Sequence, residues 1–218
     1  MALALDSEAG QATLRVARLL ADPLSVLPAG AATLPALFHA PEFRALAPKA
    51  LAATPAGAVL SEIARATRAL PERLTPEMST ALKLALAPEA QLSKAQRFLA
   101  AAIHAPRLRA ALLKAEREAM AALFGADAFE FALREGAAFC HLLAQFDEGA
   151  TLSGADFASH PAAKTAHRLM AACLMASQPA AGHVYALRST GALPQDAPEP
   201  DAQTVKQALR AMARGGTA

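Results

Sequence analysis

The pattern of hydrophobic and polar positions predicts helices along most of the chain, and most clearly over residues 106–124. Apolar residues recur there at three- and four-residue steps, and charged residues lie mainly on the other face. The apolar positions are Leu108, Leu112, Ala115, Ala119, Ala122 and Leu123. Pro106 suits a first helical turn, where its missing N–H is no loss. Gly125 suits the left-handed residue that ends a helix, so we expect this helix to stop there.

A second helix is predicted over residues 127–146, with Asp127 and Glu130 as its capping pair. Four of the nine phenylalanines of the chain gather around the glycine between the two helices. They are Phe124, Phe129, Phe131 and Phe139. This clustering predicts that the two helices pack against each other and form a core, with Phe129 and Phe139 largely buried.

Capping residues and prolines divide the remainder into further helices, about eight in all. Asp6 or Ser7 begins a helix to residue 20, Thr54-Pro55 one to residue 69, and Thr75-Pro76 one to residue 87. Ser93 and Gln96 form an expected capping box for a helix that ends before Pro106. Later helices are expected over residues 159–177, 179–187 and 201–214. No alternating strand pattern is present outside residues 183–187, so the predicted class is all-α.

Prolines recur at positions 23, 28, 35, 41, 48 and 55, a spacing that no long helix survives. Apolar residues in this stretch, including Leu37 and Phe38, suggest that it packs on the body. Residues 194–201 hold three prolines and read as an extended linker to a short C-terminal helix, after which residues 215–218 should fray. We therefore expect one compact multi-helix domain over residues 1–218, with a proline-broken N-terminal segment.

Composition supports close-packed helices and limits the possible partners. The chain is 54% hydrophobic and has no Trp, and its charged fraction of 18% is below the usual quarter. The net charge of +2, without a Lys/Arg block, does not call for nucleic acid. The N-terminus lacks a signal-peptide pattern and no apolar run is long enough to span a bilayer. We expect a cytoplasmic protein that does not insert into membranes directly.

Histidines and cysteines supply the one candidate metal site. His160 and His167 are seven residues apart, Cys173 follows within two turns, and Cys140-His141 lies on another predicted helix. Together they could form a zinc site, but no CxxC or HxxxH spacing occurs. We favour the alternative of core thiols with capping or surface histidines, and we expect no metal and no cofactor.

Catalytic motifs are not apparent in the sequence. Ser61, Ser153 and Ser177 have no Gly-x-Ser-x-Gly context, and neither cysteine has a family signature. The helical glutamates have Lys or Arg nearby, which is typical of a solvated face, and no Glu-x-x-His pair is present. We therefore expect a protein that is not an enzyme.

One segment resembles a known family. It reads Arg117-x6-Phe124-Gly125-Ala-Asp-Ala-Phe129-Glu-Phe131-Ala132-Leu133-Arg134. This order of basic helix, glycine turn and aromatic helix is similar to the K component of bacterial type III secretion systems, the SctK, YscK and PscK group. A later stretch is similar to the C-terminal region of that family, and the resemblance covers residues 102–194. The later motifs are Ala171-Ala-Cys173-Leu174, Gln178-Pro179, Leu187-Arg188 and Leu193-Pro194.

The resemblance implies a non-enzymatic, mostly helical cytosolic adaptor of the sorting platform. Such a protein links the cytosolic domain of the inner-membrane ring protein to the pod, which carries the ATPase and selects substrates. Its partners would be those two proteins, and it would lie in the cytoplasm or at the inner membrane through them. The alternative is a helical enzyme or small-ligand-binding regulator whose pocket the sequence does not reveal.

Two regions are candidate partner-binding surfaces. Leu37 and Phe38 belong to a proline-broken stretch with more apolar side chains than it can easily bury by itself. Arg107, Arg109 and Arg117 form a basic edge, and arginine pairs bidentately with carboxylates at interfaces. The alternative for these arginines is plain solvation.

Overall fold

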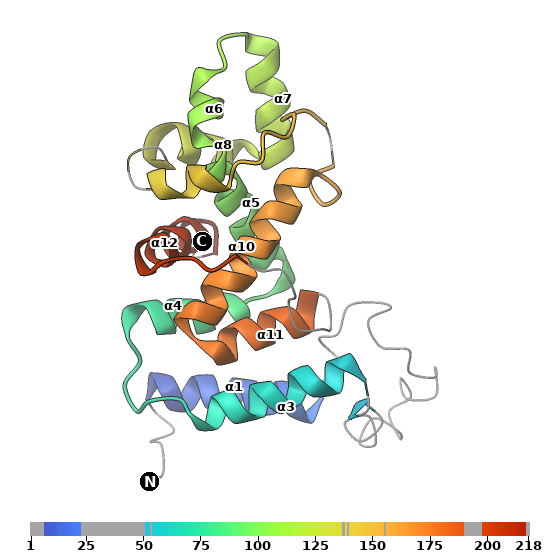
Figure 1. The fold of residues 1–218 in the computed structure, drawn as a ribbon, viewed down its shortest axis with the longest axis vertical. Coiled ribbons are helices and arrows are strands. Elements are labelled where there is room, and N and C mark those ends of the chain that lie inside the picture. The colour runs from blue at the N-terminus through green and yellow to red at the C-terminus, as the bar shows by residue number, and fades with distance from the viewer. Residues whose placement is uncertain are drawn as a thin grey trace. The chain divides into compact units, whose positions relative to one another are not determined.

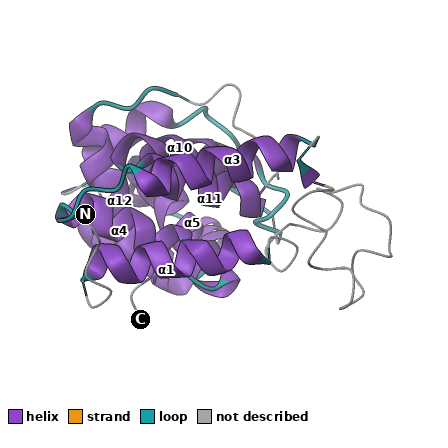
Figure 2. Ribbon diagram, turned by 90° about the horizontal axis from the view of Figure 1, so that it is seen from below, coloured by secondary structure: helices purple, strands orange, loops and turns teal. Residues whose placement is uncertain are grey.

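The computed structural model describes residues 7–22, 51–52, 54–136, 138, 140–154, 156–189 and 198–216. Helices cover most of these residues and none of them forms a strand, so the all-α prediction is confirmed (Figure 2). Residues 183–187 lie in a helix. Leu37, Phe38 and Phe139, and residues 194–197 of the expected linker, lie outside the described residues.

The chain divides into two compact units, and each is built from two separate stretches of sequence. Unit 1 comprises Met1–Leu86 and Leu174–Gln195, and unit 2 comprises Ala87–Cys173 and Asp196–Ala218. This division does not test whether either unit folds alone, so the single domain stays a prediction.

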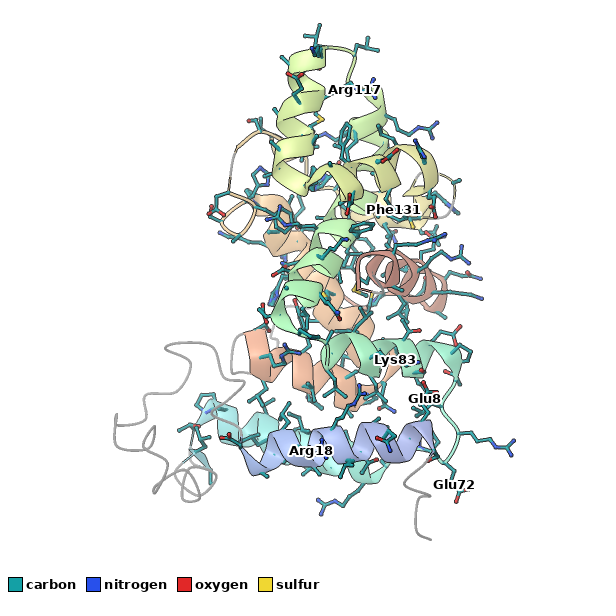
Figure 3. The ribbon with its side chains drawn as sticks, turned by 180° about the vertical axis from the view of Figure 1, so that it is seen from behind. Glu8, Arg18, Glu72, Lys83, Arg117 and Phe131 are labelled. Carbon is teal, nitrogen blue, oxygen red and sulfur yellow. The ribbon has the colours of Figure 1, made fainter. Side chains whose placement is uncertain are left out.

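Four helices form the body of unit 1: α1 (Glu8–Ala21), α3 (Pro55–Arg68), α4 (Pro76–Ala85) and α11 (Pro179–Ser189). The helix α11 packs mainly on α3 and also contacts α4, and α1 contacts both (Figure 1). Their buried faces carry side chains such as Val16, Ile63 and Tyr185. On the surface, Glu8 of α1 pairs with Lys83 of α4 at 2.7 Å (Figure 3).

The predicted caps of this unit are confirmed. The hydroxyl of Ser7 accepts a hydrogen bond from the Gly10 N–H at 3.0 Å, and that of Thr54 accepts one from Gly57 at 3.3 Å. Thr75 caps α4 in the same way, accepting from Met78 at 3.2 Å. These bonds satisfy N–H groups that have no partner inside the helix, which is why the helices begin at these residues.

Unit 2 is organised around α5 (Glu89–Ile103). This helix contacts α6 (Ala105–Ala110), α7 (Lys114–Phe124), α8 (Ala126–Phe131) and α12 (Ala202–Gly216). It also contacts a π-helical turn, η4 (Ala132–Gly136), and a 3-10 helix, η5 (His141–Phe146). The helix α10 (Pro161–Ser177) begins in unit 2 and ends in unit 1.

The aromatic core predicted around Gly125 is confirmed for the three phenylalanines that the structure describes. Phe124, Phe129 and Phe131 are all buried. The ring of Phe131 lies 5.2 Å from that of Phe98 on α5, measured between ring centroids. Gly125 has a φ of 86°, as expected for a helix-ending glycine, but its ψ of 146° is extended rather than left-handed helical.

The single helix expected over residues 106–124 is wrong, because α6 ends at Ala110 and α7 begins at Lys114. A straight helix would place Leu108 and Leu123 about 22 Å apart along its axis. Instead, α7 turns back toward α5, as Figures 1 and 3 show, and both leucines are fully buried. Tertiary burial therefore outweighs local helix propensity at the break.

The helix expected over residues 127–146 is also wrong, since α8, η4 and η5 take its place. No side chain caps α8, and Asp127 instead pairs with Lys94 of α5 at 3.1 Å. The Ser93–Gln96 box is not used either, because α5 starts earlier, after Pro88. Gln96 donates a hydrogen bond to the Ala163 carbonyl at 3.0 Å.

The C-terminal helix begins as predicted and ends later than predicted. Asp201 accepts a hydrogen bond from the Thr204 N–H at 2.7 Å and caps α12. The helix continues through Gly215, where a Cβ would lie 2.9 Å from the Lys94 carbonyl oxygen. The expected fraying at residues 215 and 216 is therefore wrong, because close packing on α5 holds the helix end in place.

Candidate interaction surface

The three arginines of the predicted basic edge lie on two helices and have different roles. Arg107 and Arg109 are on α6, and Arg117 is on α7 (Figure 3). Arg107 is half-buried and donates a hydrogen bond to Asp147 Oδ1 at 3.2 Å. Arg109 and Arg117 are exposed and form no ion pair with any residue that the structure describes. Two of the three arginines thus remain available to a partner.

Asp147 fixes the base of α6. Its carboxylate lies 3.0 Å from Nδ1 of the buried His104, although the approach is outside hydrogen-bond geometry. It also accepts a hydrogen bond from the Gly149 N–H at 2.9 Å. Because His104 stands between α5 and α6, this cluster ties the start of α6 to the loop after η5.

The charges of this cluster follow from burial and pairing. Burial lowers the pKa of His104 below its ordinary value, and the nearby Asp147 carboxylate only partly opposes that effect. Burial alone would raise the pKa of Asp147, but the Gly149 hydrogen bond, His104 and Arg107 outweigh it, so the pKa is lowered. The cluster is therefore a neutral histidine beside a carboxylate whose charge Arg107 balances.

The link between α6 and α7 carries two exposed leucines that sequence reasoning missed. Leu112 is 89% exposed and Leu113 is 64% exposed. The only other large hydrophobic residue exposed by more than a third within the described ranges is Leu14, at 37%. The spacing of apolar residues over residues 106–124 predicted that Leu112 lies on the buried face of a single helix. This prediction is wrong because the chain leaves the helix at that point. The sequence feature that could have indicated the exposed link is Leu113, because it lies off the predicted apolar face and directly precedes a run of charged residues.

Charged side chains of both signs surround these leucines. Lys114 and Glu118 pair at 3.7 Å on the exposed first turns of α7, and Glu116 and Arg117 lie between them in sequence. Arg109 stands near the end of α6. We call the set Arg109, Leu112, Leu113, Lys114, Glu116 and Arg117 the α6–α7 tip. Apolar residues within a polar rim are the usual composition of a protein interface.

A cavity of about 270 Å³ lies beside Arg109. It is lined by Ala102, Ala105, Pro106, Arg109, Gly136, Cys140 and His141. Burial raises the pKa of the Cys140 thiol to about 11, and Sγ lies 3.8 Å from the Gln207 carbonyl oxygen, to which it donates. This thiol is protonated near neutral pH and is a poor nucleophile.

Two residues of the zinc alternative, His160 and Cys173, take part in the fold itself. Nδ1 of His160 accepts a hydrogen bond from the Ala162 N–H at 3.1 Å, so this histidine caps α10. Cys173 is buried, which raises its pKa to about 12. Nowhere in the described part of the chain do three or more His, Cys, Asp or Glu side chains converge to hold a metal ion.

Within the same described part, no helix has both the length and the apolar character needed to cross a bilayer. Comparison of the chain with known protein families, curated proteins and solved structures found no match.

Proposed function

We propose that this chain is a non-enzymatic adaptor of a bacterial type III secretion sorting platform, of the K-component type. It joins the cytosolic domain of the inner-membrane ring protein to the pod that carries the ATPase. It acts in the cytoplasm, or at the inner membrane through those protein partners. Nucleic acid, a cofactor and direct membrane insertion have no part in this role.

The observation that supports the proposal is the packing of the segment that carries the resemblance. Phe124, Phe129 and Phe131 are buried around Gly125, whose positive φ favours glycine over other residues. The resemblance therefore lies in residues that form the core and the turn, and not only in the Ala and Leu that any helix contains.

A second part of the resemblance also has a structural role. Arg188, from the Leu187-Arg188 motif, donates a hydrogen bond to the Ala85 carbonyl at 2.6 Å. Ala85 is the last residue of α4, so Arg188 satisfies a carbonyl group at a helix end and joins α11 to α4.

Binding to the two proposed partners tests the function. The full chain is mixed in turn with the purified ring cytosolic domain and the pod protein from the same genome, and complexes are measured by calorimetry and gel filtration. We expect a complex with at least one of them. A folded chain that binds neither protein contradicts the proposal, as does a gene that lies far from secretion genes.

One cavity favours a second candidate, a helical ligand-binding regulator or enzyme. It measures about 380 Å³ and lies in unit 2, within the range of about 300–1,000 Å³ typical of small-ligand sites. Its lining consists of Gln145, Phe146, Glu148, Thr165, Arg168, Leu169 and Pro198. Thr165 is buried there, and Arg168 pairs with Glu148. A metabolite that raises the melting temperature of the wild type, and not of Thr165→Val, would support this candidate.

A further inference from the structure

We propose that the α6–α7 tip is the docking element of this adaptor, and that it inserts Leu112 and Leu113 into an apolar pocket of a protein partner rimmed by carboxylates. This inference rests on the proposed function for the identity of the partner. It assigns the contact to residues that lie outside the core around Gly125.

The first argument for this proposal is the exposure of Leu112 and Leu113. The other large hydrophobic side chains of the described residues are buried or half-buried, apart from Leu14, which is exposed far less than the two leucines. Leu112 and Leu113 are adjacent, at 89% and 64% exposure, so together they form one apolar feature. The fold does not use them for packing, because the buried leucines of α6 and α7 are Leu108 and Leu123.

The shape of the element indicates a knob rather than a groove. The leucines lie in the short link where the chain reverses between α6 and α7 (Figure 1). The residues that follow, Lys114 to Glu118, are all exposed. A convex apolar end of this kind is matched by a concave apolar site on a partner, where a few buried side chains supply most of the binding energy.

The charges around the leucines define the rim of that site. Arg109 and Arg117 have no acidic partner among the described residues, and Arg guanidinium groups pair bidentately with carboxylates. Glu116 and Glu118 lie on the exposed first turns of α7, shortly after the leucines in sequence, and would be repelled by anionic lipid headgroups. The mixture of signs therefore favours a protein over a membrane surface.

The cluster of His104, Arg107 and Asp147 supports the same assignment, because it fixes the start of α6 and therefore the base of the α6–α7 tip. His104 and Arg107 approach the Asp147 carboxylate at 3.0 and 3.2 Å, at the residues that begin α6. A tip on a fixed base loses less conformational entropy on binding than a flexible loop does.

The test measures, by biolayer interferometry, how tightly the full wild-type chain and the double variant Leu112→Ser/Leu113→Ser bind to the ring cytosolic domain and to the pod protein. The matched control is Leu14→Ser, since Leu14 is the third exposed large hydrophobic residue. We expect the double variant to weaken binding by about 30-fold or more, the loss typical of hot-spot side chains. The control should stay within about two-fold, because solvent-exposed contacts outside an interface contribute little. Unchanged circular dichroism melting excludes unfolding as the cause.

A charge variant adds a second readout. Arg109→Glu/Arg117→Glu should weaken binding and reduce its salt dependence, because fewer favourable ion pairs remain to be screened. Equal affinity of wild type and the leucine variant would overturn the docking assignment while leaving the adaptor function in place. Failure of the wild type to bind either protein overturns both. Leucine-dependent binding to vesicles of phosphatidylserine and phosphatidylcholine, with no protein binding, would overturn the proposal in favour of a membrane surface.

Discussion

At the scale of single residues, buried polar groups determine how the free energy of unfolding of this chain depends on pH. His104 illustrates this, because its Nε2 atom is buried without a hydrogen-bond partner while Nδ1 lies beside Asp147. Protonation would place a donor where no acceptor is available. The histidine is therefore kept neutral by burial, as the direction of its pKa shift indicates.

Acidification should destabilise the protein through this residue. The folded-state pKa of His104 is lowered from 6.5, so the unfolded chain binds the proton more readily. The stabilising contribution of neutral His104 is complete above that value and is lost as the pH falls through and below it. The lowered pKa of Asp147 adds a loss of the same sign at more acidic pH. Urea unfolding from about pH 7.5 to about pH 5 measures the effect as a falling free energy of unfolding.

His104→Gln should flatten this pH dependence in part, because His167 and His183 also have pKa values lowered by burial. His141→Gln, at an exposed position in η5, serves as the control. Equal pH slopes for wild type and His104→Gln would show that His104 does not titrate as described.

Phe124 provides the corresponding test of the core. Its side chain is fully buried, 6.1 Å from the ring of Phe157 between centroids. Phe124→Ala should lower the free energy of unfolding by about 3–5 kcal/mol, since it removes buried apolar surface and leaves a cavity. Denaturant unfolding measures the change, and a loss under about 1 kcal/mol would contradict the core assignment.

At the scale of elements, local signals and tertiary packing determine different helix ends. The caps at Ser7, Thr54, Thr75 and Asp201 could be predicted because each needs only a side chain and an N–H a few residues away. The break between α6 and α7 could not, because it depends on burying Leu108 and Leu123 against other helices. For the same reason the surface was only partly predicted: Arg109 and Arg117 are exposed, whereas Leu112 was assigned to the wrong face.

The turn between α7 and α8 should need glycine at position 125 because of the backbone conformation there, and not because a side chain would lack space. Apart from Gly125 itself and its two chain neighbours, no heavy atom lies within 4 Å of a Cβ built on this residue, but a φ of 86° is strained for residues other than glycine. Gly125→Ala should therefore cost on the order of 1–3 kcal/mol from strain alone. Gly215→Ala is a useful contrast, because the new methyl group would meet Phe98 at 2.9 Å and destabilise by overpacking. Unaltered stability of Gly125→Ala by thermal melting would contradict the strained turn.

At the scale of the whole molecule, neither unit is a continuous piece of chain. Unit 1 needs α11, which packs on α3 and α4 with Val184, Tyr185 and Leu187 buried. A fragment of residues 1–86 lacks this helix and should not unfold cooperatively. Adding a peptide of residues 174–195 should restore a cooperative melt, measured by circular dichroism. A cooperative transition in the fragment alone would show that α11 is dispensable.

The interleaving of the two units also has a consequence during synthesis on the ribosome. After Leu86 is made, 87 further residues, 87–173, are translated before the second stretch of unit 1 begins at Leu174. At a translation rate of about 5–20 residues per second, roughly 4–17 s pass between the synthesis of α1, α3 and α4 and that of α11, which packs on α3 and α4. During that interval the faces of α3 and α4 that α11 will cover are open to chaperones, so the folding yield of this chain in the cell should depend on the speed of translation.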